Sequence, residues 1–192
     1  MSIKRIAIAF SGEGSNMEVL IKKLHQKTFE SFSIEVVAAI TNKPQAKGIQ
    51  KAKNLGIDVI IIDHTLYDSR EAFDTKLVEE IKKLNVELVV LAGFMRILTP
   101  IFTSAIQSIN IHPSLLPQFK GANALQRSFK SDENIVGVTT HYVVQEVDAG
   151  EIILQKSFDK RGMTFEEFQE RIHSCEHQIF PQSVLKVIAS SH

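Results

Sequence analysis

Two polar side chains that suit carbonyl chemistry, Asn110 and His112, lie two residues apart in an otherwise apolar stretch. Side chains two apart on an extended segment point the same way, while Ile109 and Ile111 point to the other face. Pro113 has no backbone N–H and disfavours helix at His112, so the sequence predicts a short strand with a polar tip. There an amide can hold a developing oxyanion and an imidazole can move a proton. The structural alternative is a pair of polar residues that are hydrogen-bonded at a strand end and have no chemical role.

A glycine-rich segment, residues 11–16, follows an apolar run and precedes apolar residues at helical spacing. This order of strand, turn and helix predicts that the helix N-terminus holds a phosphate beside Gly14, Ser15 and Asn16. A helix cap at Ser15 or Asn16 is the structural alternative. A dinucleotide site fits less well, because Met17 occupies the third small position and no acidic residue follows the second strand.

Four apolar runs in the first half of the chain alternate with helical patterns, which is typical of an α/β fold. The runs are 6–10, 36–40, 57–62 and 88–92, and a short helix is predicted over 44–54. We expect an open, mostly parallel twisted sheet with helices on both faces. Ligands bind beyond the carboxyl ends of such strands, and there we expect the glycine-rich turn, the turn at 93–98 and the Asn110/His112 tip to meet.

After Pro117 the pattern changes, and it predicts an antiparallel hairpin followed by helices. Alternation over 136–144 and the apolar run 152–154 indicate two strands. Asp148 would then lie at the tip of the turn that joins them. An aspartate in such a place often serves turn formation alone, so its position does not yet assign it a chemical role.

The C-terminal region opens with a capping box formed by Thr164 and Glu167. We expect Pro181 to kink or restart the helix that follows. The residues predicted to point inward from that helix are Phe165, Phe168, Ile172 and Cys175. The length favours one domain over 1–192, with a mononucleotide-binding-like half at 1–100 and a catalytic half at 101–192.

The charge balance argues against polyanionic partners, because 22 Lys and Arg oppose 22 Asp and Glu. We therefore expect no binding to nucleic acid or to a membrane surface. One cysteine and the lack of a signal or membrane segment predict a cytoplasmic protein, which would act as a monomer or homodimer. No metal site is expected, because the His173/His177 spacing lacks a third ligand, and no G-x-S-x-G motif supports a serine hydrolase.

Together these motifs resemble the folate-dependent glycinamide ribonucleotide formyltransferases of purine synthesis, within the formyl transferase family. The run N-x-H-P-S-L-L-P with a later Asp is highly specific for folate formyl transferases, and the likeness extends from residue 6 to about residue 188. The matching segments are 11–16, 42–43, 68–71, 92–98, 110–117, 148–150 with 153–155, and 176–177. The resemblance implies a formyltransferase fold with a Rossmann-like N-terminal half.

The resemblance implies a reaction between two small molecules. A formyl group would pass from 10-formyltetrahydrofolate, as co-substrate, to the amine of glycinamide ribonucleotide, without a metal. Asn110, His112 and Asp148 would form the catalytic trio. The first two would hold the oxygen of a tetrahedral intermediate, while Asp148 would pair with His112, favour its charged form and help to move the amine proton.

The resemblance also carries over two sets of ligand contacts. The ribonucleotide-binding set is Gly14, Ser15, Asn16, His173 and Glu176, with the first three on the phosphate. The folate-binding set has Arg70 on the tail and, around the pterin, Met95, Arg96, Ile97, Leu98, Asn110, Val144, Gln145, Glu146, Val147 and Asp148. Two positions depart from the family pattern, because Leu125 follows Ala124 where members carry His, and His173 stands where Gln or Lys is usual.

Three other functions share part of this pattern. Methionyl-tRNA formyltransferase has a further C-terminal domain, and formyltetrahydrofolate hydrolase has an N-terminal regulatory domain, neither of which we expect here. The third is a folate-binding module without enzyme activity. Such a module would not require Asp148, so the intact trio argues against it.

Overall fold

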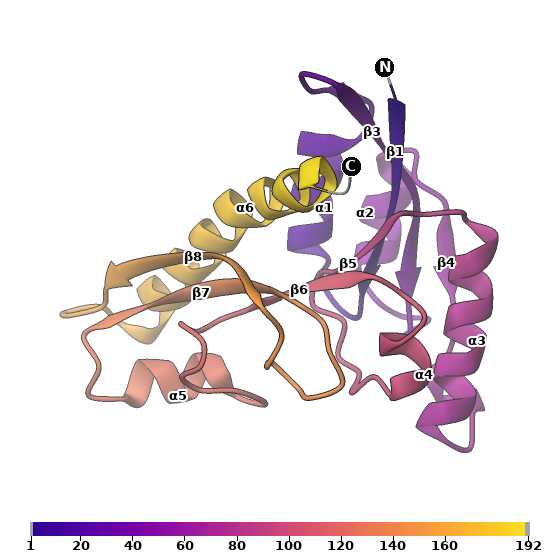
Figure 1. Ribbon diagram of the computed structural model, residues 1–192. Coiled ribbons are helices and arrows are strands. Elements are labelled where there is room, and N and C mark those ends of the chain that lie inside the picture. The colour runs from indigo at the N-terminus through magenta and orange to yellow at the C-terminus, as the bar shows by residue number, and fades with distance from the viewer. Residues whose placement is uncertain (1, 191–192) are drawn as a thin grey trace. The chain divides into compact units, whose positions relative to one another are not determined.

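The computed structural model describes residues 2–190 and contains two compact units (Figure 1). The chain divides between them at Ile109 and Asn110. The single domain predicted over 1–192 stays a prediction, and its ends at residues 1 and 191–192 lie outside the described part.

The first unit is built on parallel strands, because its apolar runs are buried on both faces. In the sheet, β1 lies between β3 and β5, with Ile6 opposite both Val36 and Leu88. Residues 6–10 are at most 1% exposed, which confirms the continuous apolar run as a central strand. The strands are β1 (Ser2–Phe10), β2 (Lys27–Thr28, antiparallel to β3), β3 (Phe32–Thr41), β4 (Val59–Ile61, beside β3) and β5 (Leu88–Leu91).

Helices connect these strands and cover them with amphipathic faces. Figure 1 shows α1 and α2 on one side of the first unit's strands and α3 on the other. The helix α1 buries Met17, Leu20, Ile21 and Leu24, and α3 buries an equivalent stripe that includes Phe73. The helical segments are α1 (Ser15–Leu24), α2 (Gly48–Asn54), the 3₁₀ turn η1 (His64–Leu66), α3 (Arg70–Lys83) and α4 (Pro100–Thr103). The predicted α/β class is confirmed.

Two predicted elements of the first unit differ from the structure. The run 57–62 forms a strand only at Val59–Ile61, where Ile61 is 45% exposed, because β4 pairs with β3 alone. The helix expected from Pro44 begins only at Gly48, since a turn closed by the Ala46 N–H on the Lys43 carbonyl precedes it. Apolar composition predicted a strand and a helix in these segments. It did not predict that the strand pairs on one side only or where the helix begins.

The second unit contains the predicted antiparallel hairpin. The strand β6 (Ser108–His112) crosses the boundary between the units, and in the second unit the order is β6, β7 (Ile135–Tyr142), β8 (Ile152–Asp159). Within the hairpin, Val136 lies opposite Phe158 and Thr140 lies opposite Leu154. The helices are α5 (Ala124–Lys130) and α6 (Phe165–Ser190), the second packed on β7 and β8.

The long helix α6 begins at the predicted capping box. The Thr164 N–H donates to Glu167 Oε2 at 2.8 Å, and the Glu167 N–H donates to Thr164 Oγ1 at 3.2 Å. Pro181 lies inside one continuous helix and does not restart it, because the buried residues around it pack against the hairpin and outweigh one lost hydrogen bond. Phe165 is 36% exposed, so its predicted inward position is wrong, whereas Phe168, Ile172 and Cys175 are buried. No helix between residues 2 and 190 is long and apolar enough to cross a membrane.

We predict that Thr164→Ala destabilises the protein by ~0.5–2 kcal/mol, the usual cost of a lost N-cap. The substitution removes the hydroxyl that accepts from the Glu167 N–H. Urea denaturation of the variant and the wild type measures the difference. Thr75→Ala removes an exposed helix hydroxyl that donates to the Glu71 carbonyl and is no cap, so it serves as the control. Equal stability of Thr164→Ala and wild type would contradict the capping role.

Candidate active site

The strand β6 delivers Asn110 and His112 as its alternation predicts. Ile109 and Ile111 are 0% and 8% exposed and belong to the core, while Asn110 is half-buried and His112 is 5% exposed. The strand ends at His112, directly before Pro113. The polar tip of the strand is therefore set by local sequence, and its imidazole is taken almost entirely out of water.

Asp148 reaches His112 from the turn between β7 and β8. Its Oδ2 lies 3.3 Å from His112 Nδ1, and its side chain is 9% exposed. The Gly121 N–H donates to the same Oδ2 at 2.8 Å. Asp148 has a φ of 53°, a left-handed conformation that aspartate tolerates better than most residues. The turn geometry and the contact to His112 thus come from the same residue.

The imidazole of His112 lies between two acceptors. Its Nε2 is 2.9 Å from the Phe119 carbonyl oxygen, while Nδ1 faces Asp148. A neutral ring can donate to only one of them, and an imidazolium can donate to both. Burial lowers the pKa of His112 below its ordinary value, although the Phe119 carbonyl and the Asp148 charge both raise it. Asp148 therefore acts in the predicted direction, although desolvation is the larger effect and the pKa of His112 falls overall.

Asp148 stays ionised in spite of its position. Burial alone would raise its pKa, but hydrogen bonds from His141 and from the Gly121 N–H, together with the positive potential of His112, lower that pKa below its ordinary value. A carboxylate that accepts several hydrogen bonds is a poor proton acceptor at rest and a strong partner for an imidazolium. The second unit therefore holds a fixed negative charge beside a ring that is neutral at rest.

His141 is a member of this cluster that the sequence reasoning missed. It is 2% exposed, and its Nδ1 lies 2.8 Å from the Tyr142 carbonyl oxygen. Its Nε2 lies 3.4 Å from Asn110 Nδ2 and 3.5 Å from Asp148 Oδ1. His141 thus connects Asn110 to Asp148. The alternation of β7 places His141 on the face opposite Thr140 and Tyr142. In the sequence, the signal that could have pointed to it was a histidine close to the end of a predicted strand.

The loop before α5 supplies two of the contacts to the trio, Phe119 and Gly121. Arg127 stabilises it, because its Nη1 donates to the Lys120 carbonyl at 2.8 Å and the Ala122 carbonyl at 3.2 Å. The same guanidinium lies 5.7 Å from the centre of the Phe119 ring. The carbonyl and N–H that meet His112 and Asp148 are therefore held in place by a cation of α5.

The other predicted residues of the second unit lie on the hairpin turn and on α6. Glu146 is paired with Lys120 at 3.2 Å, and Val144 and Val147 are 44% and 46% exposed. On α6, Glu176 is 7% exposed, whereas His173 is exposed and stacks on His177 with ring centres 6.5 Å apart. Within residues 2–190, no three His, Cys, Asp or Glu side chains are placed to hold a metal ion. Gln145 is exposed on the same turn.

In the first unit, the glycine-rich turn has a backbone that only glycine fits. Gly14 is the N-cap of α1 with a φ of 70°, and a Cβ there would lie 2.9 Å from both Gly48 Cα and Met17 Cε. Ser15 and Asn16 are the first two residues of α1, so the alternative that either is the N-cap is wrong. The first turn of α1 carries the positive end of the helix dipole, which attracts an anion.

The first unit also holds the folate-matched segment 95–98 and Arg70. Met95 and Ile97 are 72% and 58% exposed, Leu98 is half-buried, and Arg96 lies with its guanidinium 5.2 Å from the centre of the Phe73 ring. Arg70 is exposed as the first residue of α3. Apolar side chains thus face solvent on a segment that directly follows a buried strand, which is where ligands bind in such sheets.

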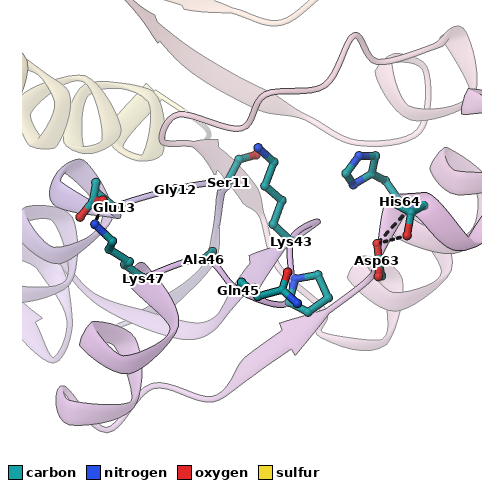
Figure 2. Close-up of a pocket in the computed structure, with 11 residues that line it drawn as sticks. Ser11, Gly12, Glu13, Lys43, Gln45, Ala46, Lys47, Asp63 and His64 are labelled. Atoms are coloured by element: carbon teal, nitrogen blue, oxygen red, sulfur yellow. Dashed lines mark hydrogen bonds and ion pairs between the residues drawn. The ribbon is translucent and has the colours of Figure 1, made fainter.

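A pocket of about 550 Å³ opens at the carboxyl ends of three parallel strands of the first unit. Figure 2 shows its lining side chains, with Lys47 beside Glu13 and with Lys43, Asp63 and His64 on the neighbouring strand ends. The Lys47 to Glu13 distance is 2.8 Å. The residues of the pocket are Ser11, Gly12, Glu13, Lys43, Pro44, Gln45, Ala46, Lys47, Asp63, His64 and Thr65. Sequence reasoning located the strand ends but not this pocket.

We predict that Asp148→Asn lowers the pKa of His112 further, because the substitution removes a charge that raises it. An NMR titration of the His112 ring measures the shift. Glu146→Gln removes a carboxylate from the same turn that pairs with Lys120, and it should leave the His112 titration unchanged. An identical His112 pKa in Asp148→Asn and wild type would show that the two groups are not coupled.

Comparison with known proteins identifies the family. The formyl transferase family model matches residues 4–184. A phosphoribosylglycinamide formyltransferase of Bacillus subtilis is 35% identical over 187 residues, covering 96% of this chain and 94% of that protein. The crystal structure of a phosphoribosylglycinamide formyltransferase from Campylobacter jejuni has a TM-score of 0.95 and 52% identity, covering 97% of this chain and 98% of that one.

Longer relatives match as well. The trifunctional purine biosynthetic protein adenosine-3 of Bos taurus is 42% identical over 189 residues, which are 97% of this chain and 18% of that protein. The chain thus spans less than a fifth of this trifunctional relative and nearly the whole of the bacterial ones. The match over most of the chain confirms the resemblance seen in the motifs, and the chain belongs to the formyl transferase family.

Proposed function

We propose that this chain transfers the formyl group of 10-formyltetrahydrofolate to the amine of N1-(5-phospho-D-ribosyl)glycinamide. The products are formylglycinamide ribonucleotide and tetrahydrofolate, and the reaction is one step of purine synthesis. The observation that carries the proposal is the buried cluster of Asn110, His112 and Asp148, with 3.3 Å between His112 Nδ1 and Asp148 Oδ2. The bacterial relatives named for this activity support it.

In the proposed mechanism, the amine nitrogen attacks the formyl carbon and forms a tetrahedral intermediate with a negative oxygen. Asn110 Nδ2 donates a hydrogen bond to that oxygen. His112 exchanges its contact to the Phe119 carbonyl for the substrate, and its Nε2 donates to the same oxygen once it has taken up the amine proton. The ring is neutral at rest, so it can take the proton that the amine loses and deliver it to the leaving folate nitrogen. Cleavage of the carbon–N10 bond then releases tetrahydrofolate.

Asp148 has a supporting part in these steps. Its carboxylate stays ionised and lies against the ring nitrogen that does not face the substrate, so it stabilises the imidazolium that forms in transit. His141 and the Gly121 N–H hold the same carboxylate in its orientation. Because these donors are already in place before substrate binds, little reorganisation is needed when charge develops on the imidazole.

We assign the ribonucleotide phosphate to Gly14, Ser15 and Asn16, with His173 and Glu176 as further ribonucleotide contacts. The N-terminus of α1, which Gly14 begins and where the positive end of the helix dipole lies, supports the phosphate assignment. For the folate, we assign the tail to Arg70 and the pterin to the two turns that the family pattern matches. Exposed apolar side chains on both turns support this, since an aromatic ring can cover them. The pterin set is Met95, Arg96, Ile97, Leu98, Asn110, Val144, Gln145, Glu146, Val147 and Asp148.

We further propose that the partners are small molecules only and that the protein works in the cytoplasm. The one cysteine, Cys175, is 1% exposed, and burial raises the pKa of its thiol. Such a thiol is inert, which suits a reducing compartment. Formylated folate is a co-substrate that leaves as tetrahydrofolate, and the chemistry above requires no metal.

Incubation with 10-formyltetrahydrofolate, with and without the ribonucleotide, tests the activity directly. We expect release of tetrahydrofolate only when the ribonucleotide is present. His112→Ala should lower kcat by at least ~10²-fold and change the folate KM little, since the imidazole acts on the reacting carbon. His25→Asn is the control, because His25 accepts a hydrogen bond from the Val36 N–H in the first unit. Release without ribonucleotide would indicate a hydrolase, and wild-type turnover in His112→Ala would remove that residue from the mechanism.

The phosphate assignment has its own test in the double substitution Ser15→Ala and Asn16→Ala. One lost charge-assisted hydrogen bond is worth ~1.5–3 kcal/mol, so we expect a roughly tenfold to hundredfold higher KM for the ribonucleotide. The folate KM and the thermal unfolding temperature should stay nearly constant. Lower stability with both KM values unchanged would return these residues to a structural role.

A further inference from the structure

The motif Asn42-Lys43 matches the family pattern but has no part in the chemistry above. Asn42 follows β3, is 1% exposed, and accepts a hydrogen bond from Ser11 Oγ at 2.6 Å. Ser11 follows β1 and is 3% exposed. A buried hydrogen bond between two strand ends fixes both side chains, because leaving either group unsatisfied away from water is costly.

Ser11 in turn holds the beginning of the segment 95–98. The Met95 N–H donates to Ser11 Oγ at 2.8 Å, and the Ser11 N–H donates to the Gly93 carbonyl at 3.0 Å. A hydroxyl has one proton and two acceptor lone pairs. Because Asn42 takes the proton, a lone pair of Ser11 Oγ is directed at Met95. The chain of bonds therefore runs from Met95 through Ser11 to Asn42.

His64 fixes the far end of this chain. Its Nδ1 lies 2.8 Å from the Asn42 carbonyl oxygen and 3.2 Å from Asn42 Nδ2. The ring thus contacts both the backbone and the side chain of Asn42. Ser11 and His64 also line the pocket of the first unit (Figure 2).

The hydrogen bond to Ser11 ties the Met95 backbone to the end of β1. Met95 and Ile97 are 72% and 58% exposed, so their side chains contribute little burial that would hold the backbone. We propose that Asn42 is a positioning residue that, through Ser11, fixes the Met95 backbone at the entrance of the folate-binding segment. This inference rests on the proposed function only for its effect on folate binding, and not for the effect on Met95.

Amide hydrogen exchange of Met95 in the ligand-free protein is the first test. A neutral hydrogen bond is worth about 0.5–1.5 kcal/mol, so Asn42→Ala should make this amide exchange roughly 2- to 10-fold faster. Ser11→Ala removes the acceptor itself and should act in the same way, which keeps the test valid if Asn42→Ala does not fold. The double variant should exchange no faster than Ser11→Ala, because both changes break one chain.

Steady-state kinetics are the second test. Asn42→Ala should raise the KM for 10-formyltetrahydrofolate by a similar roughly 2- to 10-fold and leave the ribonucleotide KM unchanged. Asn42→Asp keeps an acceptor oxygen for Ser11, with His64 beside it, and should restore both the protection of Met95 and the folate KM. Thr164→Ala loses stability in the second unit and should change neither, so it controls for destabilisation alone.

The outcomes separate the two proposals. Unchanged Met95 exchange in Asn42→Ala, or equally faster exchange throughout the first unit, would overturn the positioning role. Faster Met95 exchange with an unchanged folate KM would overturn its link to folate. If the wild type transfers no formyl group, the proposed function fails, and the exchange of Met95 still decides whether Asn42 positions it.

Discussion

The buried carboxylate of Asp148 is the charge on which the polar architecture of the second unit depends. A charge out of water must be paired or hydrogen-bonded. Asp148 meets this requirement with the Gly121 N–H at 2.8 Å and with His112 and His141 at 3.3 and 3.5 Å. The left-handed turn at Asp148 and the loop held by Arg127 both follow from the need to bring these groups together.

The same burial determines what the histidine can do. Desolvation and ion pairing act in opposite directions on His112, and desolvation is larger, so its pKa falls. A ring that is neutral at rest can receive a proton, and a carboxylate that stays ionised can stabilise the result. The pair can therefore accept a proton and stabilise the imidazolium that results, as the attack of an amine on a formyl carbon requires.

Sequence patterns predicted the features that depend on neighbours along the chain. These include the buried β1, the strand that carries Asn110 and His112, and the capping box of α6. The features that were predicted wrongly depend on contacts between distant residues. Examples of such features are the edge position of β4 and the continuous helix through Pro181. His141 was missed for the same reason, since its role lies in distances to Asn110 and Asp148. The trio itself came from the family resemblance, because no local pattern connects Asp148 to His112.

The measurement that most directly tests this account is the protonation state of the His112 ring in the wild-type protein. Ring nitrogen shifts, followed by NMR as the pH is lowered from neutral, report it without any substitution. We expect a neutral ring at pH 7, with a pKa below the ordinary value because the effect of burial is larger than that of the Asp148 charge. A ring that is already an imidazolium at pH 7 would contradict this expectation. The effect of the Asp148 charge would then be larger than that of burial, and the protonated ring could not accept the amine proton.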